Sequence, residues 1–158
     1  MSEPGTKERR KISRGARTRG RQLALQFFYS YEQNRFEDTG RLVPSDDLDD
    51  LDAEARDFAK RLFTGFIAQR PAIDAAIDQR LVNWTIARLS VIDRAILRLG
   101  TYELIYGEDT PAKVAINEAI ELAKRFGSEA NTARLVNGVL DKIAKGTGPA
   151  PARPAAGD

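Results

Sequence analysis

Arginine side chains recur at every second position just before the first apolar segment of the chain. Arg17, Arg19 and Arg21 lie there, and basic residues are frequent back to Lys7. A guanidinium group binds phosphate through paired hydrogen bonds and stacks on planar bases. A helix that begins among arginines lacks the carboxylates that its dipole prefers, and an incoming phosphate would supply that negative charge. The spacing indicates an anion-binding arm for nucleic acid or, second, for an anionic membrane surface; the alternative is a merely solvated tail.

Paired carboxylates are the other candidates for chemistry. Glu118 and Glu121 are three residues apart in a helical pattern, so they could in principle ligate a metal or share a proton. The alternative is that both lie on the wet face of an amphipathic helix, since Glu121 is one turn from Arg125. We favour a solvent-exposed position for Glu118 and Glu121, and we interpret Asp74 and Asp78 in the same way.

The chain contains no His and no Cys. This excludes imidazole bases, thiolate nucleophiles, disulfides and zinc sites with nitrogen or sulfur ligands. The sequence also has neither a nucleotide-binding glycine loop nor a nucleophile elbow. We therefore expect a protein that is not an enzyme, with no cofactor and no bound metal.

Composition indicates one domain with two tails. The chain has 158 residues, of which 42% are hydrophobic, and a formal net charge of +2. We expect a disordered basic arm at 1–16, one helical domain at 17–146 and a disordered Pro/Ala-rich tail at 147–158. No apolar run approaches the roughly 20 residues that span a bilayer, and no hydrophobic segment follows the basic N-terminus as in a signal peptide. We expect a cytoplasmic protein with no membrane partner.

Apolar residues recur at three- and four-residue steps, which predicts an all-α bundle of about six or seven helices. The pattern covers 18–31, 52–67, 71–81, 90–107, 113–127 and 128–146, with an acidic loop at 37–50. Ser90 and Asp93 resemble a capping box. Phe27 and Phe28 are expected in the core rather than on a base-stacking platform, whereas Tyr29 falls off the apolar stripe. For Gly138, which costs about 1 kcal/mol in a helix relative to Ala, we favour close packing of a neighbouring helix over room for a bound strand.

Three stretches resemble the NusB family of bacterial transcription antitermination factors. They are 113–127 with 136–141, then 88–99 with 102–104, and 17–26 with Tyr29. The resemblance implies two packed helical sub-bundles. It also implies binding to the boxA element of nascent ribosomal RNA, as a heterodimer with the small-subunit ribosomal protein that acts as NusE. The complex acts on the RNA polymerase elongation complex with other Nus factors.

The resemblance also implies roles for individual residues. Tyr29 corresponds to a position on the protein-partner surface, and Asp93 to an acidic residue that contacts bases. The residues expected to bind RNA are Arg17, Arg19, Arg21, Gln22, Asp93, Asn131, Arg134 and Leu135. Two departures concern the last loop: 128–134 is one residue longer than the family pattern, and Leu135 lies where a base-stacking aromatic is often found. The Arg134 guanidinium could stack in its place.

Two other functions remain open from sequence. RNA cytosine methyltransferases carry a NusB-like helical domain, so the chain could be a detached RNA-binding module of such an enzyme. It could also be a helical interaction protein whose basic arm binds a membrane surface. A homodimer is possible as well, because an apolar surface meant for a partner can pair with itself.

Overall fold

The computed structural model describes residues 12–33, 53–107 and 109–146. Within these ranges the chain forms α2 (Arg14–Gln33), α3 (Ala53–Asp78), the 3-10 helix η3 (Ile86–Arg88), α4 (Val91–Tyr106), α5 (Ala112–Phe126) and α6 (Thr132–Lys145). No strand occurs in them, which confirms the all-helical prediction. None of the described helices is long and apolar enough to cross a membrane. The basic arm up to residue 11, the acidic loop at 37–50 and the C-terminal tail at 147–158 lie outside the described residues.

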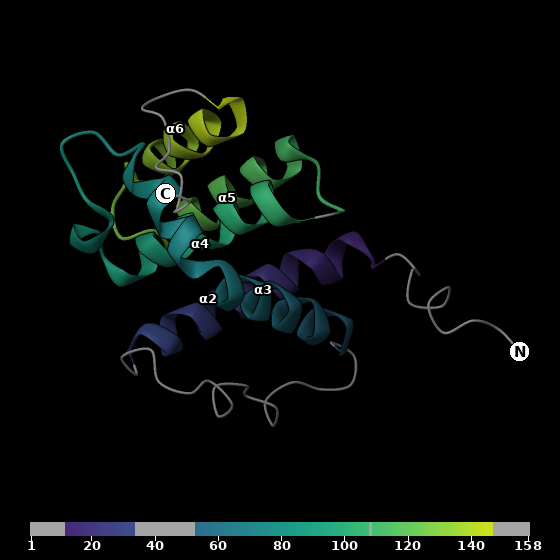
Figure 1. The fold of residues 1–158 in the computed structure, drawn as a ribbon. Helices are drawn as coiled ribbons and strands as arrows, with labels where there is room; N and C mark the ends of the chain where they lie inside the picture. The colour runs from purple at the N-terminus through teal and green to yellow at the C-terminus, as the bar shows by residue number, and fades with distance from the viewer. Residues whose placement is uncertain (1–11, 34–52, 108, 147–158) are drawn as a thin grey trace, which may run out of the picture.

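Helix α4 is the centre of the fold. It contacts α2 and α3 on one side and α5 and α6 on the other. Figure 1 shows α2 and α3 lying alongside each other, with α4 between them and the α5–α6 pair. Because α4 has neighbours all round, every residue from Asp93 to Thr101 is buried.

In the described part of the chain, two of the predicted helices form a single kinked one. The segments at 52–67 and 71–81 join as α3, and Gln69 is the non-helical residue inside it, with φ −119° and ψ 16°. Pro71 explains the kink, since proline lacks an N–H donor and its ring clashes with the carbonyl one turn before. The predicted break therefore bends the helix without ending it.

Helix α2 begins earlier than the domain boundary that we expected at residue 17. It starts at Arg14, and the Ser13 hydroxyl accepts a hydrogen bond from the Ala16 N–H at 3.1 Å, as in an N-cap. Ala16 is buried and Ile12 packs against the core. The arginines at 17, 19 and 21 therefore lie within the helix rather than before it.

An aromatic cluster joins α2 to α3. Phe28 stacks on Phe66 with ring centroids 4.6 Å apart, and Phe63 meets Phe27 edge to face at 6.1 Å. Phe27 and Phe28 are both buried, which confirms their predicted place in the core, whereas Tyr29 is exposed as its position off the stripe indicated. Such pairs add about 0.5–1.5 kcal/mol each beyond the area that they bury.

Glycine marks one of the closest helix crossings. A Cβ atom on Gly100 of α4 would lie 2.8 Å from a Leu140 methyl carbon of α6 and 3.1 Å from Ala119 Cβ of α5. The expected close packing at Gly138 is wrong: this residue is exposed, and no atom lies within 4 Å of the Cβ it would carry. The sequence signal was ambiguous because Gly138 lies between buried positions of α6 and its side faces solvent.

Replacing Gly138 by Ala is expected to raise the free energy of unfolding by about 0.5–1 kcal/mol, because Ala loses less conformational freedom in a helix and meets no clash here. Urea denaturation measures it. The matched control is Gly100→Ala, which is expected to be destabilising because its Cβ has no room. A destabilised Gly138→Ala protein would contradict the open surface described for α6.

Candidate nucleic-acid interface

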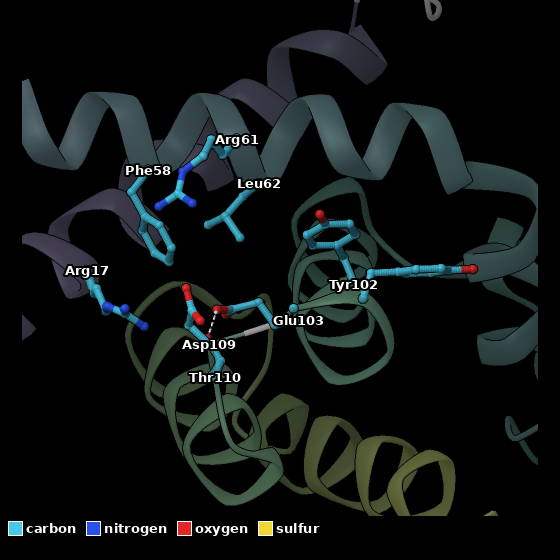
Figure 2. A pocket seen from close by; sticks show the side chains of 10 residues that line it. Arg17, Phe58, Arg61, Leu62, Tyr102, Glu103, Asp109 and Thr110 are labelled. Atoms are coloured by element: carbon cyan, nitrogen blue, oxygen red, sulfur yellow. Dashed lines mark hydrogen bonds between the residues drawn. The ribbon is translucent and has the colours of Figure 1, made fainter. Parts of the chain in front are cut away.

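Arg17 is available on the surface of the fold. It lines a pocket of about 250 Å³ between α2, α3, the last turns of α4 and the segment after α4. Its guanidinium carbon lies 5.6 Å from the centroid of the Phe58 ring, and that of Arg61 lies 5.5 Å from the same ring. Figure 2 shows the two arginines reaching Phe58 from different helices. Arg61 was not among the predicted residues, since only the packing of α3 on α2 brings it beside Arg17.

Arg21 does not face the solvent as expected. Its side chain is only 3% exposed and binds Glu103, itself 2% exposed, through hydrogen bonds of 2.7 and 2.9 Å to the two carboxylate oxygens. Glu103 also accepts a hydrogen bond from the Thr110 hydroxyl at 3.2 Å. Because α2 begins at Arg14, Arg21 lies two turns inside the helix and is turned toward α4. Its cation is already neutralised within the fold.

The two glutamates of α5, Glu118 and Glu121, have different surroundings. Glu118 is half-buried and lies 3.6 Å from the Arg21 guanidinium, so its predicted place on the wet face is only partly right. Glu121 is exposed as expected, but its partner is Lys124 at 3.5 Å rather than Arg125. Among the described residues no group of three or more acidic side chains could hold a metal ion. The two glutamates therefore have different neighbours and form no shared site.

The other predicted residues of α2 lie toward its outer face. Arg19 is exposed, and Gln22 is half-buried in a shallow pocket of about 410 Å³ that Lys124 and Arg125 of α5 also line. Two turns further on, the exposed Tyr29 hydroxyl accepts a hydrogen bond from the Gln33 amide at 3.1 Å. This face of α2 is polar and open, as a surface for a partner requires.

Asp93 is buried and fastens the turn between α5 and α6. Its carboxylate accepts hydrogen bonds from the Ser128 N–H at 2.9 Å and the Ser128 hydroxyl at 2.5 Å, and from the Thr132 hydroxyl at 3.2 Å. Its own N–H donates to the Ser90 hydroxyl at 3.2 Å, which confirms Ser90 as the cap of α4. The carboxylate is thus occupied within the fold, contrary to the expectation that it is presented to bases. Ser128 precedes α6, but its hydroxyl donates to Asp93 and does not cap that helix.

The remaining residues predicted to bind RNA lie at the end of the loop after α5 and in the first turn of α6. Asn131 is exposed and Leu135 half-buried, and both line an open pocket of about 590 Å³ next to Asp93. Arg134 is exposed but does not line this pocket. The fold therefore brings Asn131 and Leu135 together. Arg17 lies elsewhere, beside Glu103. Glu103 is ten positions after Asp93 in α4, which corresponds to about 15 Å along the helix at 1.5 Å per residue.

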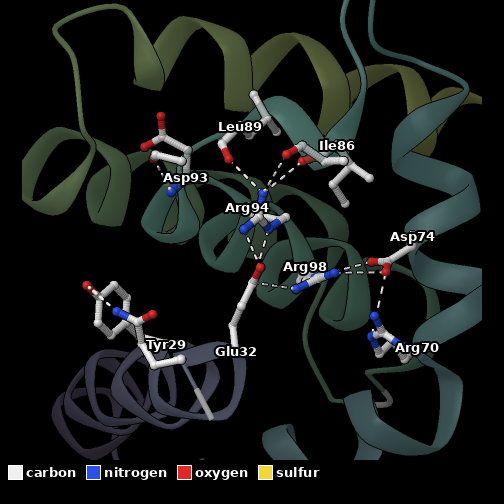
Figure 3. Close-up of polar contacts among 12 residues, drawn as sticks. Tyr29, Glu32, Arg70, Asp74, Ile86, Leu89, Asp93, Arg94 and Arg98 are labelled. Atoms are coloured by element: carbon white, nitrogen blue, oxygen red, sulfur yellow. Dashed lines mark hydrogen bonds and ion pairs between the residues drawn. The ribbon is translucent and has the colours of Figure 1, made fainter. Parts of the chain in front are cut away.

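A buried network of charges, which the sequence did not reveal, supports the start of α4. Glu32 accepts hydrogen bonds from both Arg94 and Arg98, and Arg98 also binds Asp74 at 2.8 and 2.9 Å (Figure 3). Arg94 donates further hydrogen bonds to the backbone carbonyls of Ile86, Ala87 and Leu89. Arg94 and Arg98 are one turn apart within an apolar helix, which was the available signal that they are buried.

Curated proteins and a family model resemble this chain over most of its length. The model of the NusB family matches residues 18–145. The transcription antitermination protein NusB of Geobacter sulfurreducens is 44% identical over 131 residues, which cover 82% of this chain and 94% of the relative. The protein of the same name from Bacillus velezensis is 43% identical over 129 residues, or 80% and 94% of the two chains.

Solved structures agree with these matches. T. maritima NusB superposes with a TM-score of 0.74 at 41% identity, covering 84% of this chain and 93% of its own. A chain from the crystal structure of antitermination factors NusB and NusE in complex with dsRNA superposes with a TM-score of 0.73 at 27% identity, covering 85% and 100%. Sequence and fold thus point to the same relatives over nearly their whole length. The chain belongs to the NusB family.

Proposed function

We propose that this chain is a transcription antitermination factor that binds single-stranded boxA-type RNA of nascent ribosomal RNA transcripts. It binds together with the small-subunit ribosomal protein that acts as NusE, and the assembly modifies elongation by RNA polymerase with other Nus factors. The observation that supports RNA and NusE as partners is the likeness to a chain from the structure of NusB and NusE with dsRNA, which covers 85% of this chain. The protein works in the cytoplasm and catalyses no reaction.

The positions of the predicted residues on the described surface suggest which part of the assembly each of them binds. Arg17 and Arg19 bind RNA phosphates, and Gln22 lies beside them on α2. Asn131, Arg134 and Leu135 approach the bases. Tyr29, on the open face of α2, contacts the ribosomal protein. Arg21 and Asp93 act by positioning other groups, because their charges are satisfied inside the fold.

A titration of boxA-like RNA, with and without the ribosomal protein and at two salt concentrations, tests the proposal. We expect binding that is tighter with the partner and weaker at high salt. Duplex RNA of the same sequence is the comparison that tests the preference for a single strand. If neither RNA binds at low salt in the presence of the partner, the proposed function is wrong.

Replacing Arg17 and Arg19 by Ala is expected to weaken RNA binding at all sequences and to lower the log–log salt slope by about 0.7 for each phosphate that is no longer neutralised. Fluorescence anisotropy of a labelled RNA measures both. The control with the same change in charge is Lys142→Ala/Lys145→Ala, in the last turn of α6. If the salt slope is unchanged in the arginine variant, or decreases equally in the lysine variant, Arg17 and Arg19 do not belong to the RNA interface.

A further inference from the structure

The connection between α3 and α4 exposes two large apolar side chains. Val82 is 69% exposed and Trp84 is 45% exposed. Between them, Asn83 has a φ of 58°, in the left-handed region that non-glycine residues seldom adopt. Backbone conformations of this kind cost free energy and are concentrated at binding and catalytic sites. Val82 and Trp84 thus lie exposed on either side of a backbone conformation that asparagine tolerates better than most residues.

The connection is held firmly in place. Arg94 donates hydrogen bonds to three carbonyls between Ile86 and Leu89, and Glu32 fixes the Arg94 guanidinium from the other side (Figure 3). The Ile86 N–H donates to Asp78 at 2.9 Å. An aromatic side chain on such a support is preorganised, so that little ordering entropy opposes the binding of a ligand.

Trp84 forms one side of the 590 Å³ pocket that Asn131 and Leu135 also line. It is the one aromatic ring among the lining residues, and the Arg88 guanidinium carbon lies 4.9 Å from its centroid. Hydrogen-bonding groups surround this platform, namely the Asn131 amide, the Ser90 hydroxyl and the Glu129 carboxylate. A flat aromatic face with donors and acceptors at its rim matches an unstacked nucleobase, which has a π-face and a polar edge.

We propose that Trp84 is the stacking platform for one unpaired base of the bound RNA, with Arg88 supporting the indole and Asn131 meeting the edge of the base. The ligand class depends on the proposed function, but the site does not include the phosphate contacts of Arg17 and Arg19. A protein side chain from the ribosomal partner is the alternative occupant. The mixture of polar and apolar lining favours the base, since an apolar side chain would leave the amide and carboxylate unpaired.

The fluorescence of Trp84 tests this inference directly, because Trp84 is the only tryptophan of the chain. The full chain is titrated with a boxA-like RNA while the anisotropy of a labelled copy reports binding. We expect quenching that saturates with the anisotropy, and RNAs with 2-aminopurine at single positions to identify the stacked base. RNA binding without a change in Trp84 fluorescence would overturn the inference and leave the proposed function intact. A response only when the ribosomal protein is added would assign the pocket to that partner instead.

Substitutions provide the second readout. Trp84→Ala is expected to weaken RNA binding about 5- to 150-fold, the range for loss of one base–aromatic stack, whereas Trp84→Phe keeps a ring and loses much less. The salt slope should stay unchanged, because stacking releases no counterions. The control is Ile105→Ala on α4, which removes an equally exposed apolar side chain. Thermal melting checks that both the wild-type and the Trp84→Ala proteins are folded. If both are folded and bind RNA with equal affinity, the inference is overturned.

Discussion

Replacing Arg21 by Ala is expected to lower the free energy of unfolding by about 3–5 kcal/mol, the usual cost of removing one partner from a buried ion pair. In the wild-type protein the Glu103 side chain is 2% exposed, and the variant would leave its carboxylate with the Thr110 hydroxyl as the remaining described hydrogen-bond donor. An isolated buried carboxylate is poorly solvated, so the native state loses more than two hydrogen bonds. Urea or thermal denaturation measures the change.

The control for this prediction is the double variant Arg21→Met/Glu103→Leu. It removes both charges and replaces them with apolar groups, so it is expected to be more stable than Arg21→Ala alone. The single variant also separates two roles of Arg21. A protein that keeps its stability but loses RNA affinity would show that Arg21 binds phosphate rather than Glu103.

Replacing Glu32 by Ala is expected to lower the free energy of unfolding by a similar amount, about 3–5 kcal/mol. Glu32 is the carboxylate shared by Arg94 and Arg98, whose side chains are both largely buried. Arg98 would retain Asp74, whereas Arg94 would retain only backbone carbonyls among its described hydrogen-bond partners. The matched control is Glu121→Ala, which removes an exposed glutamate paired with Lys124 and is expected to change stability by no more than about 0.5 kcal/mol. Equal effects of the two substitutions would contradict the importance of the buried network.

The periodicity of the sequence predicted the helices and much of the core because each depends on residues close in the chain. Ser90 caps α4 and Phe27 and Phe28 are buried, as their local spacing indicated. The break predicted between 67 and 71 is at the right place, but whether Pro71 bends or ends the helix depends on the packing around it. Patterns of residues close in the chain therefore predicted the positions of the helices better than the kinks and connections between them.

The candidate site was harder to predict because the direction of a charged side chain depends on distant partners. Arg21 and Glu103 are 82 residues apart in the chain, and nothing around Arg21 distinguishes it from Arg17. Asp93 likewise meets Ser128, 35 residues away. Arg61 and Trp84 became candidates only when tertiary packing placed them beside other groups.

The two buried charge clusters also determine how α2 aligns with α4. Arg21 meets Glu103 near one end of the pair, and Glu32 meets Arg94 and Arg98 toward the other, so the helices run in opposite directions. Sliding α2 by one helical turn, about 5.4 Å, would separate both clusters at once. Apolar side chains could exchange neighbours after such a slip, but buried ions could not, because each would lose its counter-charge. The salt bridges thus select a single register from those that the apolar core alone would tolerate.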